Sequence, residues 1–200
     1  MINIQSIIQN TQYAIYSVCS LICAVFLSWI TFASTDFAYP IFHDSLGIEQ
    51  HTQKYGPQNR YRHNFENTDR AERIRLFSSI NTSIHNQGTG LAAIDYHDKT
   101  TGLKINSLLH TSEILHLNDV ANLIDFFKWV AVVATFIWLG MIARFYLNQK
   151  SPPNIKQQSL ATLGLLVACT VLILLIGPVN VFYALHEWIF PANHKWFFYY

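Results

Sequence analysis

The chain has 200 residues and a formal net charge of +1, a balance that gives no support for binding nucleic acid. It is 51% hydrophobic but only 12% charged, whereas an average soluble domain carries about twice that charged fraction. The charges crowd into the middle of the chain, between long uncharged runs. These features argue against an ordinary soluble protein and predict an integral membrane protein built as one unit.

The first uncharged run covers residues 14–33 and has the length of one membrane span, about 20 residues. A cleaved signal peptide is the alternative interpretation. However, no Lys or Arg precedes the run, and no clean small-x-small cleavage site follows it. We therefore predict a retained transmembrane helix as the core of an N-terminal part that covers residues 1–35.

The three cysteines, Cys19, Cys23 and Cys169, all fall inside apolar runs. Cys19 and Cys23 are one helical turn apart, so a metal or disulfide role is conceivable. We prefer to interpret all three as small packing residues at the depth of the lipid. The polar segment of residues 36–118 contains no cysteine, so it is not a disulfide-stapled domain.

This polar segment is expected to be mainly helical. Its clearest helix covers residues 67–85, where Asn67 or Thr68 can act as the N-cap and Asp69 favours the first turn. One apolar face recurs at three- and four-residue steps and consists of Ile74, Phe77, Ile80 and Ile84. Gly88 is a plausible stop for the helix.

Irregular structure is expected on both sides of that helix. The letters YGPQNRYRHNF before it indicate a loop, in which Arg60 and Tyr61 could meet a lipid phosphate. A structural salt bridge is an equally good interpretation of this arginine. After the helix, LAAIDYHDKTTGLKINSLL has two short apolar pieces around a Gly-containing turn, which predicts a weak hairpin.

From about Ser112 the chain is expected to turn helical again and to run into a second span at residues 124–147. The third span, residues 160–185, is the most apolar stretch, and Gly177 and Pro178 should kink it near its end. The predicted fold class is therefore an all-α membrane protein with three transmembrane helices. Its third part, residues 119–200, carries the last two of them.

The connection between the second and third spans predicts the orientation. It contains Arg144, Lys150 and Lys156 and no acidic residue, and short basic loops stay in the cytoplasm. The N-terminus should then be cytoplasmic too. The polar segment and the tail after Leu185 should lie on the other side of the membrane.

Two histidine motifs could carry chemistry. His116 and Asp119 are neighbours on one helix face, and a carboxylate beside a histidine raises its basicity and fixes its tautomer. Asn122 continues this polar stripe toward the membrane and could bind substrate. His186 and Glu187 follow the third span, so the predicted topology brings both histidines to the same side of the membrane and near the same depth.

A role at the membrane interface, without chemistry, is the alternative for both motif histidines. The remaining histidines are expected at the surface or at interfaces: His43, His51, His63, His85, His97, His110 and His194. The tail is rich in aromatic residues of the kind found at membrane interfaces, namely Trp188, Phe190, Trp196, Phe197, Phe198, Tyr199 and Tyr200.

The segment HLNDVANLI resembles the H-x-x-D-V motif of the lipoprotein intramolecular transacylase family of bacterial membrane proteins. LHEWIFPANHKW resembles the second motif of that family, and GPQNRYRHNF resembles a subgroup found in Gram-negative bacteria. The order and separation of the two motifs fit as well. Chains of the family continue into a fourth membrane helix, and no such helix is expected within these 200 residues.

The resemblance implies an enzyme of the bacterial inner membrane that needs no cofactor. The family moves the sn-2 acyl chain of a diacylglyceryl-cysteine lipoprotein to the α-amine of the same cysteine. The catalytic pair would be His116 and His186, with Asp119 and Glu187 in supporting roles. The implied partners are the lipoprotein substrate and membrane lipid, and the oligomeric state is left open.

Two other classes of function are compatible with the same residues. Histidines on two membrane helices can ligate a haem iron or a metal, with the adjacent carboxylates orienting them. An absorption spectrum and elemental analysis would identify such a protein. Alternatively, the chain could be a non-catalytic membrane subunit or chaperone, which would co-purify with a partner and tolerate replacement of both histidines.

Overall fold

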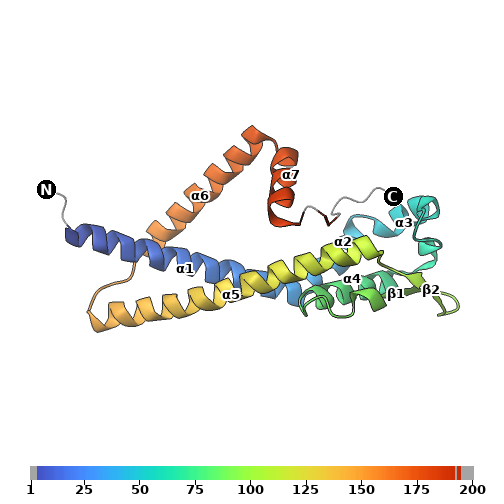
Figure 1. Ribbon diagram of the computed structural model, residues 1–200, viewed down its shortest axis with the longest axis horizontal. Coiled ribbons are helices and arrows are strands. Elements are labelled where there is room, and N and C mark those ends of the chain that lie inside the picture. The colour runs from blue at the N-terminus through green and yellow to red at the C-terminus, as the bar shows by residue number, and fades with distance from the viewer. Residues whose placement is uncertain (1–3, 192, 195–200) are drawn as a thin grey trace. The chain divides into compact units, whose positions relative to one another are not determined.

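The computed structural model describes residues 4–191, 193 and 194. Helices dominate these residues, and the sheet that they contain has two short strands. The elements in chain order are α1 (Ile4–Ser34), η1 (Asp36–Ala38), α2 (Tyr39–Ser45), α3 (Ile48–Tyr55), η2 (Gly56–Gln58), η3 (Phe65–Asn67), α4 (Arg70–Ile84), η4 (Leu91–Ala93), β1 (Asp95–His97), β2 (Lys104–Ser107), α5 (Thr111–Leu147), α6 (Ile155–Ile176) and α7 (Pro178–Ile189) (Figure 1). The predicted fold class, an all-α membrane protein, is confirmed.

Three helices of the described chain are long and apolar enough to cross a membrane: Ile7–Ser34, Thr111–Leu147 and Ile155–Ile176. The first two contain the spans predicted at 14–33 and 124–147. The third differs from the predicted 160–185, because the helix ends at Ile176 and Pro178 begins α7. The kink expected at Gly177 and Pro178 is thus a complete break, as a proline without an N–H group favours the first turn of a new helix.

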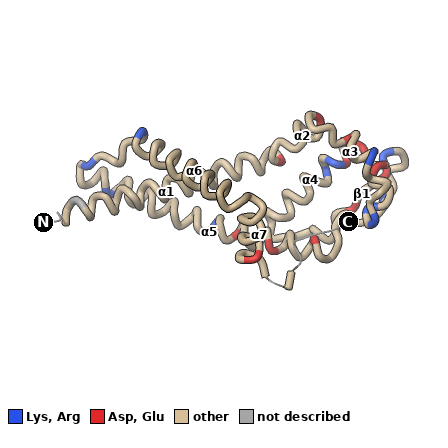
Figure 2. Tube along the Cα trace, turned by 90° about the horizontal axis from the view of Figure 1, so that it is seen from above, with Lys and Arg blue, Asp and Glu red and all other residues tan. Residues whose placement is uncertain are grey.

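Residues of the chain form two compact units, which we describe separately. The spanning unit comprises Met1–Trp29 and Phe127–Ile189, and the head unit comprises Ile30–Phe126 and Phe190–Tyr200. Charged residues are sparse along α1 and α6, and many of them belong to α2, α3 and α4 (Figure 2). The head unit therefore extends beyond the polar segment of 36–118 and takes in residues that follow α7.

Aromatic contacts join α1 to α5 in the spanning unit. The ring of Tyr16 lies 6.1 Å from that of Trp138 and 5.7 Å from that of Phe145, measured between centroids. Cys19 is buried, and Cys23 Sγ lies 3.3 Å from Thr135 Oγ1. All three cysteines are free thiols. Large apolar side chains of α6 are exposed along its length, as expected for a helix that contacts lipid.

The apolar core of the head unit lies between α4, η4 and the hairpin. Its buried members are Leu76, Leu91, Ile94, Tyr96 and Leu108. Tyr96 is fully buried, and its hydroxyl donates to the backbone oxygen of His63 at 2.8 Å. Strands β1 and β2 pair antiparallel with Asp95 opposite Ser107, which confirms the predicted hairpin.

Helix α4 lies inside the predicted range of 67–85, with a different cap. Asp69 is the N-cap and accepts the backbone N–H of Glu72 at 2.8 Å. Neither Asn67 nor Thr68 takes this role, and Thr68 is instead fully buried before the helix. The helix ends at Ile84, and the N–H of Gly88 then bonds the Ser83 oxygen at 2.8 Å.

Candidate active site

An ion pair fixes the start of α5, the helix that carries the first histidine motif. Glu113 accepts the backbone N–H of His110 at 2.9 Å, as the third residue of a helix does in a capping box. Arg62 holds the same carboxylate with contacts of 2.5 and 2.7 Å, and its Nε donates to the Leu108 oxygen at 3.1 Å. The side chains of Arg62 and Glu113 are only 17% and 11% exposed.

The structural salt bridge that was the alternative interpretation for Arg60 is therefore made by Arg62. Arg60 itself is exposed, and Tyr61 is 45% exposed with its ring 4.8 Å from that of His110. The loop before α4 is thus joined to α5 by its second arginine. A substrate-binding role for Arg60 and Tyr61 stays a prediction.

One turn of α5 further on, His116 and Asp119 contact residues that follow α7. The ring of Phe190 meets the ring of His116 edge-on, with centroids 4.8 Å apart. Asp119 Oδ2 lies 2.6 Å from Nδ1 of His194. All four residues belong to the head unit. The segment after α7 therefore packs against the H-x-x-D turn of α5.

The contact between Asp119 and His194 has a defined chemistry. An ionised carboxylate oxygen can only accept, so Nδ1 of His194 is the donor in this contact, and in the neutral ring Nε2 is the nitrogen that accepts a proton. The side chain of Asp119 is 14% exposed and that of His194 is 27% exposed. The sequence predicts His194 at the surface or at an interface and pairs Asp119 with His116. The resolved partner of Asp119 is the histidine 75 positions away.

The first histidine motif is also in contact with the loop after α4. Gly88 approaches Asn118 so closely that a Cβ atom added to this glycine would lie 2.0 Å from Asn118 Oδ1. The φ angle of Gly88 is +73°, a left-handed conformation that glycine adopts without strain. Asn122, the next residue of the predicted polar stripe, is exposed.

His186 and Glu187 lie on α7 in the spanning unit. Nδ1 of His186 donates to the Phe182 backbone oxygen at 2.8 Å, and its ring lies 3.9 Å from the ring of Phe182. Because a carbonyl only accepts, Nε2 is the nitrogen of His186 that can take a proton. Glu187 is exposed. The pairing of His186 with His116 stays a prediction.

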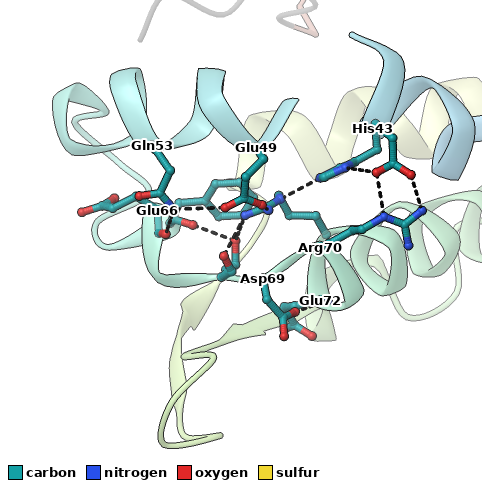
Figure 3. Close-up of polar contacts among 11 residues, drawn as sticks. His43, Glu49, Gln53, Glu66, Asp69, Arg70 and Glu72 are labelled. Atoms are coloured by element: carbon teal, nitrogen blue, oxygen red, sulfur yellow. Dashed lines mark hydrogen bonds and ion pairs between the residues drawn. The ribbon is translucent and has the colours of Figure 1, made fainter. Parts of the chain in front are cut away.

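A second polar cluster of the head unit connects α2 and α3 to α4 through hydrogen bonds and ion pairs (Figure 3). The guanidinium of Arg73, 2% exposed, donates to Nε2 of His43 at 3.0 Å and pairs with Glu49. Arg70 binds Asp44 with two contacts of 2.7 Å, and this hydrogen bonding lowers the pKa of Asp44 to about 2. The cluster joins elements that are distant in sequence, so we interpret it as structural.

A groove of about 620 Å³ runs along α4 and is separate from the histidine motifs. Its lining consists of Asp36, Ala71, Ile74, Arg75, Ser78, Ser79, Thr82, Ser83, Gly90, Ala93 and Ile94. None of the candidate site residues lines it. Among the residues that the structure describes, no three His, Cys, Asp or Glu side chains come together as metal ligands would.

Part of the aromatic tail also bears on the site. Trp188 is 82% exposed, whereas Phe190 is only partly exposed beside His116. Trp196, Phe197, Phe198, Tyr199 and Tyr200 lie outside the described residues. An interfacial role for these five aromatic residues stays a prediction.

The family model for "Lipoprotein intramolecular transacylase Lit" matches residues 14–200 of the chain. No curated protein and no solved structure matches the chain. The matched range contains the head unit, the helices α5, α6 and α7, and both histidine motifs.

Proposed function

Because the chain belongs to the lipoprotein intramolecular transacylase family, we propose that it moves the sn-2 acyl chain of a diacylglyceryl-cysteine lipoprotein to the α-amine of that cysteine. The protein is an enzyme of lipoprotein acyl transfer, and its apolar helices fit a membrane protein. The observation that carries the finer proposal is the match over residues 14–200, which includes His116 and His186 in their motifs.

The reaction needs no nucleophilic side chain from the protein. An α-amine has a pKa near 7.7–8.0 in general, so part of it is neutral and nucleophilic at physiological pH. Its nitrogen attacks the ester carbon, a C–N bond forms and the bond from that carbon to the glyceryl oxygen breaks. Holding amine and ester together supplies much of the acceleration, since well-oriented intramolecular reactions gain about 7–11 kcal/mol.

Proton transfer is the work left to the side chains. The amine must lose a proton and the departing glyceryl oxygen must gain one. We assign His116, oriented by Asp119, as the base, and His186, influenced by Glu187, as the group that polarises the ester or acts as acid. The opposite assignment is equally compatible with the motifs. Support for His186 comes from its bond to Phe182, which leaves Nε2 as the proton-accepting nitrogen.

The proposed location is the bacterial inner membrane, with the N-terminus in the cytoplasm and the site facing the periplasm. The basic connection that contains Arg144, Lys150 and Lys156 supports this orientation. Membrane lipid would then surround α6, whose large apolar side chains are exposed. The lipoprotein substrate would reach the site from within the same membrane.

The test is mass spectrometry of the N-terminal peptide of a lipoprotein that is co-expressed with this chain. We expect the wild type to yield the lyso-form, with the acyl chain on the cysteine nitrogen. His116→Ala and His186→Ala should each lower conversion by about 10²- to 10⁴-fold, the usual contribution of an acid–base group.

The matched control is His51→Ala, which removes an exposed histidine of the head unit outside the motifs. This variant should convert lipoprotein at the wild-type rate. All variants should be present in the membrane fraction in equal amounts. Full conversion by either motif variant would falsify the assigned mechanism, and a wild type that produces no lyso-form would contradict the proposed reaction.

A further inference from the structure

We propose that His194, held by Asp119, is a third histidine of the transfer site and accepts the proton of the attacking amine. This inference rests on the proposed function and moves the proton-accepting step from His116 to His194. The two motif histidines would then act on the ester. The observation that carries it is the contact of 2.6 Å between Nδ1 of His194 and Oδ2 of Asp119.

The pair has the arrangement that a general base requires. The Asp119 carboxylate accepts the Nδ1 proton of His194, which fixes the tautomer and stabilises the imidazolium that forms when Nε2 takes a second proton. Both side chains are mostly withdrawn from solvent, at 14% and 27% exposed, so water screens their interaction less than at an open surface.

The surroundings place this pair beside the motif that the proposed function uses. Asp119 lies one turn after His116 on α5, so the two side chains leave the helix on the same face. Phe190 packs against the ring of His116 and comes only a few residues before His194. One short segment therefore contacts both residues of the H-x-x-D turn.

The proposed step balances without a further reactant. Nε2 of His194 accepts a proton from the amine while the nitrogen forms its bond to the ester carbon. When the bond from that carbon to the glyceryl oxygen breaks, the imidazolium gives the same proton to that oxygen. The histidine returns to its neutral form, as in hydrolases that use one histidine first as base and then as acid.

Three variants separate this chemistry from a structural contact. His194→Asn keeps an N–H donor for Asp119 but lacks a nitrogen that accepts a proton. His194→Ala removes both, and Asp119→Asn removes the carboxylate. We expect His194→Asn and His194→Ala to lower the rate of lyso-form production by about 10²- to 10⁴-fold. The double variant that combines His194→Ala with Asp119→Asn should be no slower than His194→Ala alone, because the two residues act as one group.

A structural contact would give the opposite pattern. His194→Asn would then keep the wild-type rate, and that result would overturn the inference. His51→Asn is the matched control and should be as active as the wild type. If the wild type itself converts no lipoprotein, the proposed function fails and the role of His194 in transfer fails with it. An active wild type with an active His194→Asn variant overturns only the role of His194.

A second measurement does not depend on activity. Nitrogen NMR of the full chain, labelled with ¹⁵N-histidine in detergent, distinguishes the two neutral tautomers, and His194→Ala identifies the signal. We expect His194 to carry its proton on Nδ1 and to lose this preference in Asp119→Asn. A proton on Nε2 in the wild type would overturn the proposed pair, whatever the activity of the protein.

Discussion

Glu72 on α4 binds three groups with one carboxylate. Arg75 contacts it at 2.7 Å through both Nε and NH2, and the backbone N–H and Nδ1 of His97 each lie 2.9 Å from Oε1. Burial by itself would raise the pKa of Glu72. The hydrogen bonds from Arg75 and His97 outweigh burial and lower the pKa of Glu72 to about 2. The contacts that link α4 to β1 through this carboxylate are therefore strongest while it is ionised.

We predict that the head unit loses stability in acid through this group. The folded-state pKa of Glu72 is below the reference value of 4.5, so its contribution is complete above pH 4.5 and is lost as the pH falls through about 2. Thermal unfolding of the purified protein, followed by circular dichroism from neutral pH to about 2, measures this loss.

Glu72→Gln is the informative variant for the acid response. It should be less stable at neutral pH, because Arg75 and His97 lose a charged partner. Between pH 4.5 and 2 the unfolding free energy of the variant should fall less steeply than that of the wild type. The two slopes should differ by at most about 1.4 kcal/mol per pH unit, the value for one proton. An acid response equal to that of the wild type would show that Glu72 does not contribute to it.

At this scale the sequence predicts residues whose partners are close in the chain. The spacing of His116 and Asp119 places them on one helix face, and His186 and Glu187 are adjacent. His194 cannot be found in this way, because its partner Asp119 is 75 positions away. The ion pair of Arg62 cannot be predicted from the sequence for the same reason, since 51 positions separate it from Glu113.

At the scale of the elements, the contact between α5 and the loop after α4 requires that residue 88 has no side chain. Asn118 occupies the space where a side chain at residue 88 would begin. We predict that Gly88→Ala destabilises the protein by about 2–5 kcal/mol, the sum of left-handed strain and overpacking. Its unfolding midpoint in a thermal melt should fall accordingly.

Gly102→Ala is the matched control for this contact. Gly102 has a φ angle of +67°, close to that of Gly88, but nothing lies within 4 Å of an added Cβ. Its replacement should cost only the backbone strain, about 1–2 kcal/mol. Combining Gly88→Ala with Asn118→Ala should recover the difference between the two glycine variants. Equal destabilisation by Gly88→Ala and Gly102→Ala would show that Asn118 is not the obstacle.

The element boundaries show which local signals can be read from the sequence. The continuous helix from about Ser112 into the membrane follows from its composition and is present as α5. The cap of α4 is ambiguous in the sequence because Asn67, Thr68 and Asp69 are all good N-caps. The structure has Asp69 in this role, and Thr68 is buried. The predicted third span extends past Pro178 because the residues on both sides of this proline are apolar. The structure begins a new helix there.

For the molecule as a whole, the basic connection between α5 and α6 predicts the orientation in the membrane. We expect a reporter enzyme that is active only outside the cytoplasm to be active when fused after Arg60 in the head unit. The same reporter should be inactive when fused after Pro152, between α5 and α6. The reverse pattern would contradict the orientation predicted from the basic connection.

The packing of Phe190 and His194 on α5 bears on how the integrity of this protein is judged. A chain cut after Ile189 keeps every helix and strand described here, including all three apolar helices. Its circular dichroism spectrum and its insertion would resemble those of the intact chain. Yet it would lack Phe190, which contacts His116, and His194, which contacts Asp119. Helical content is therefore a poor quality control for this enzyme, and intact mass is the safer criterion.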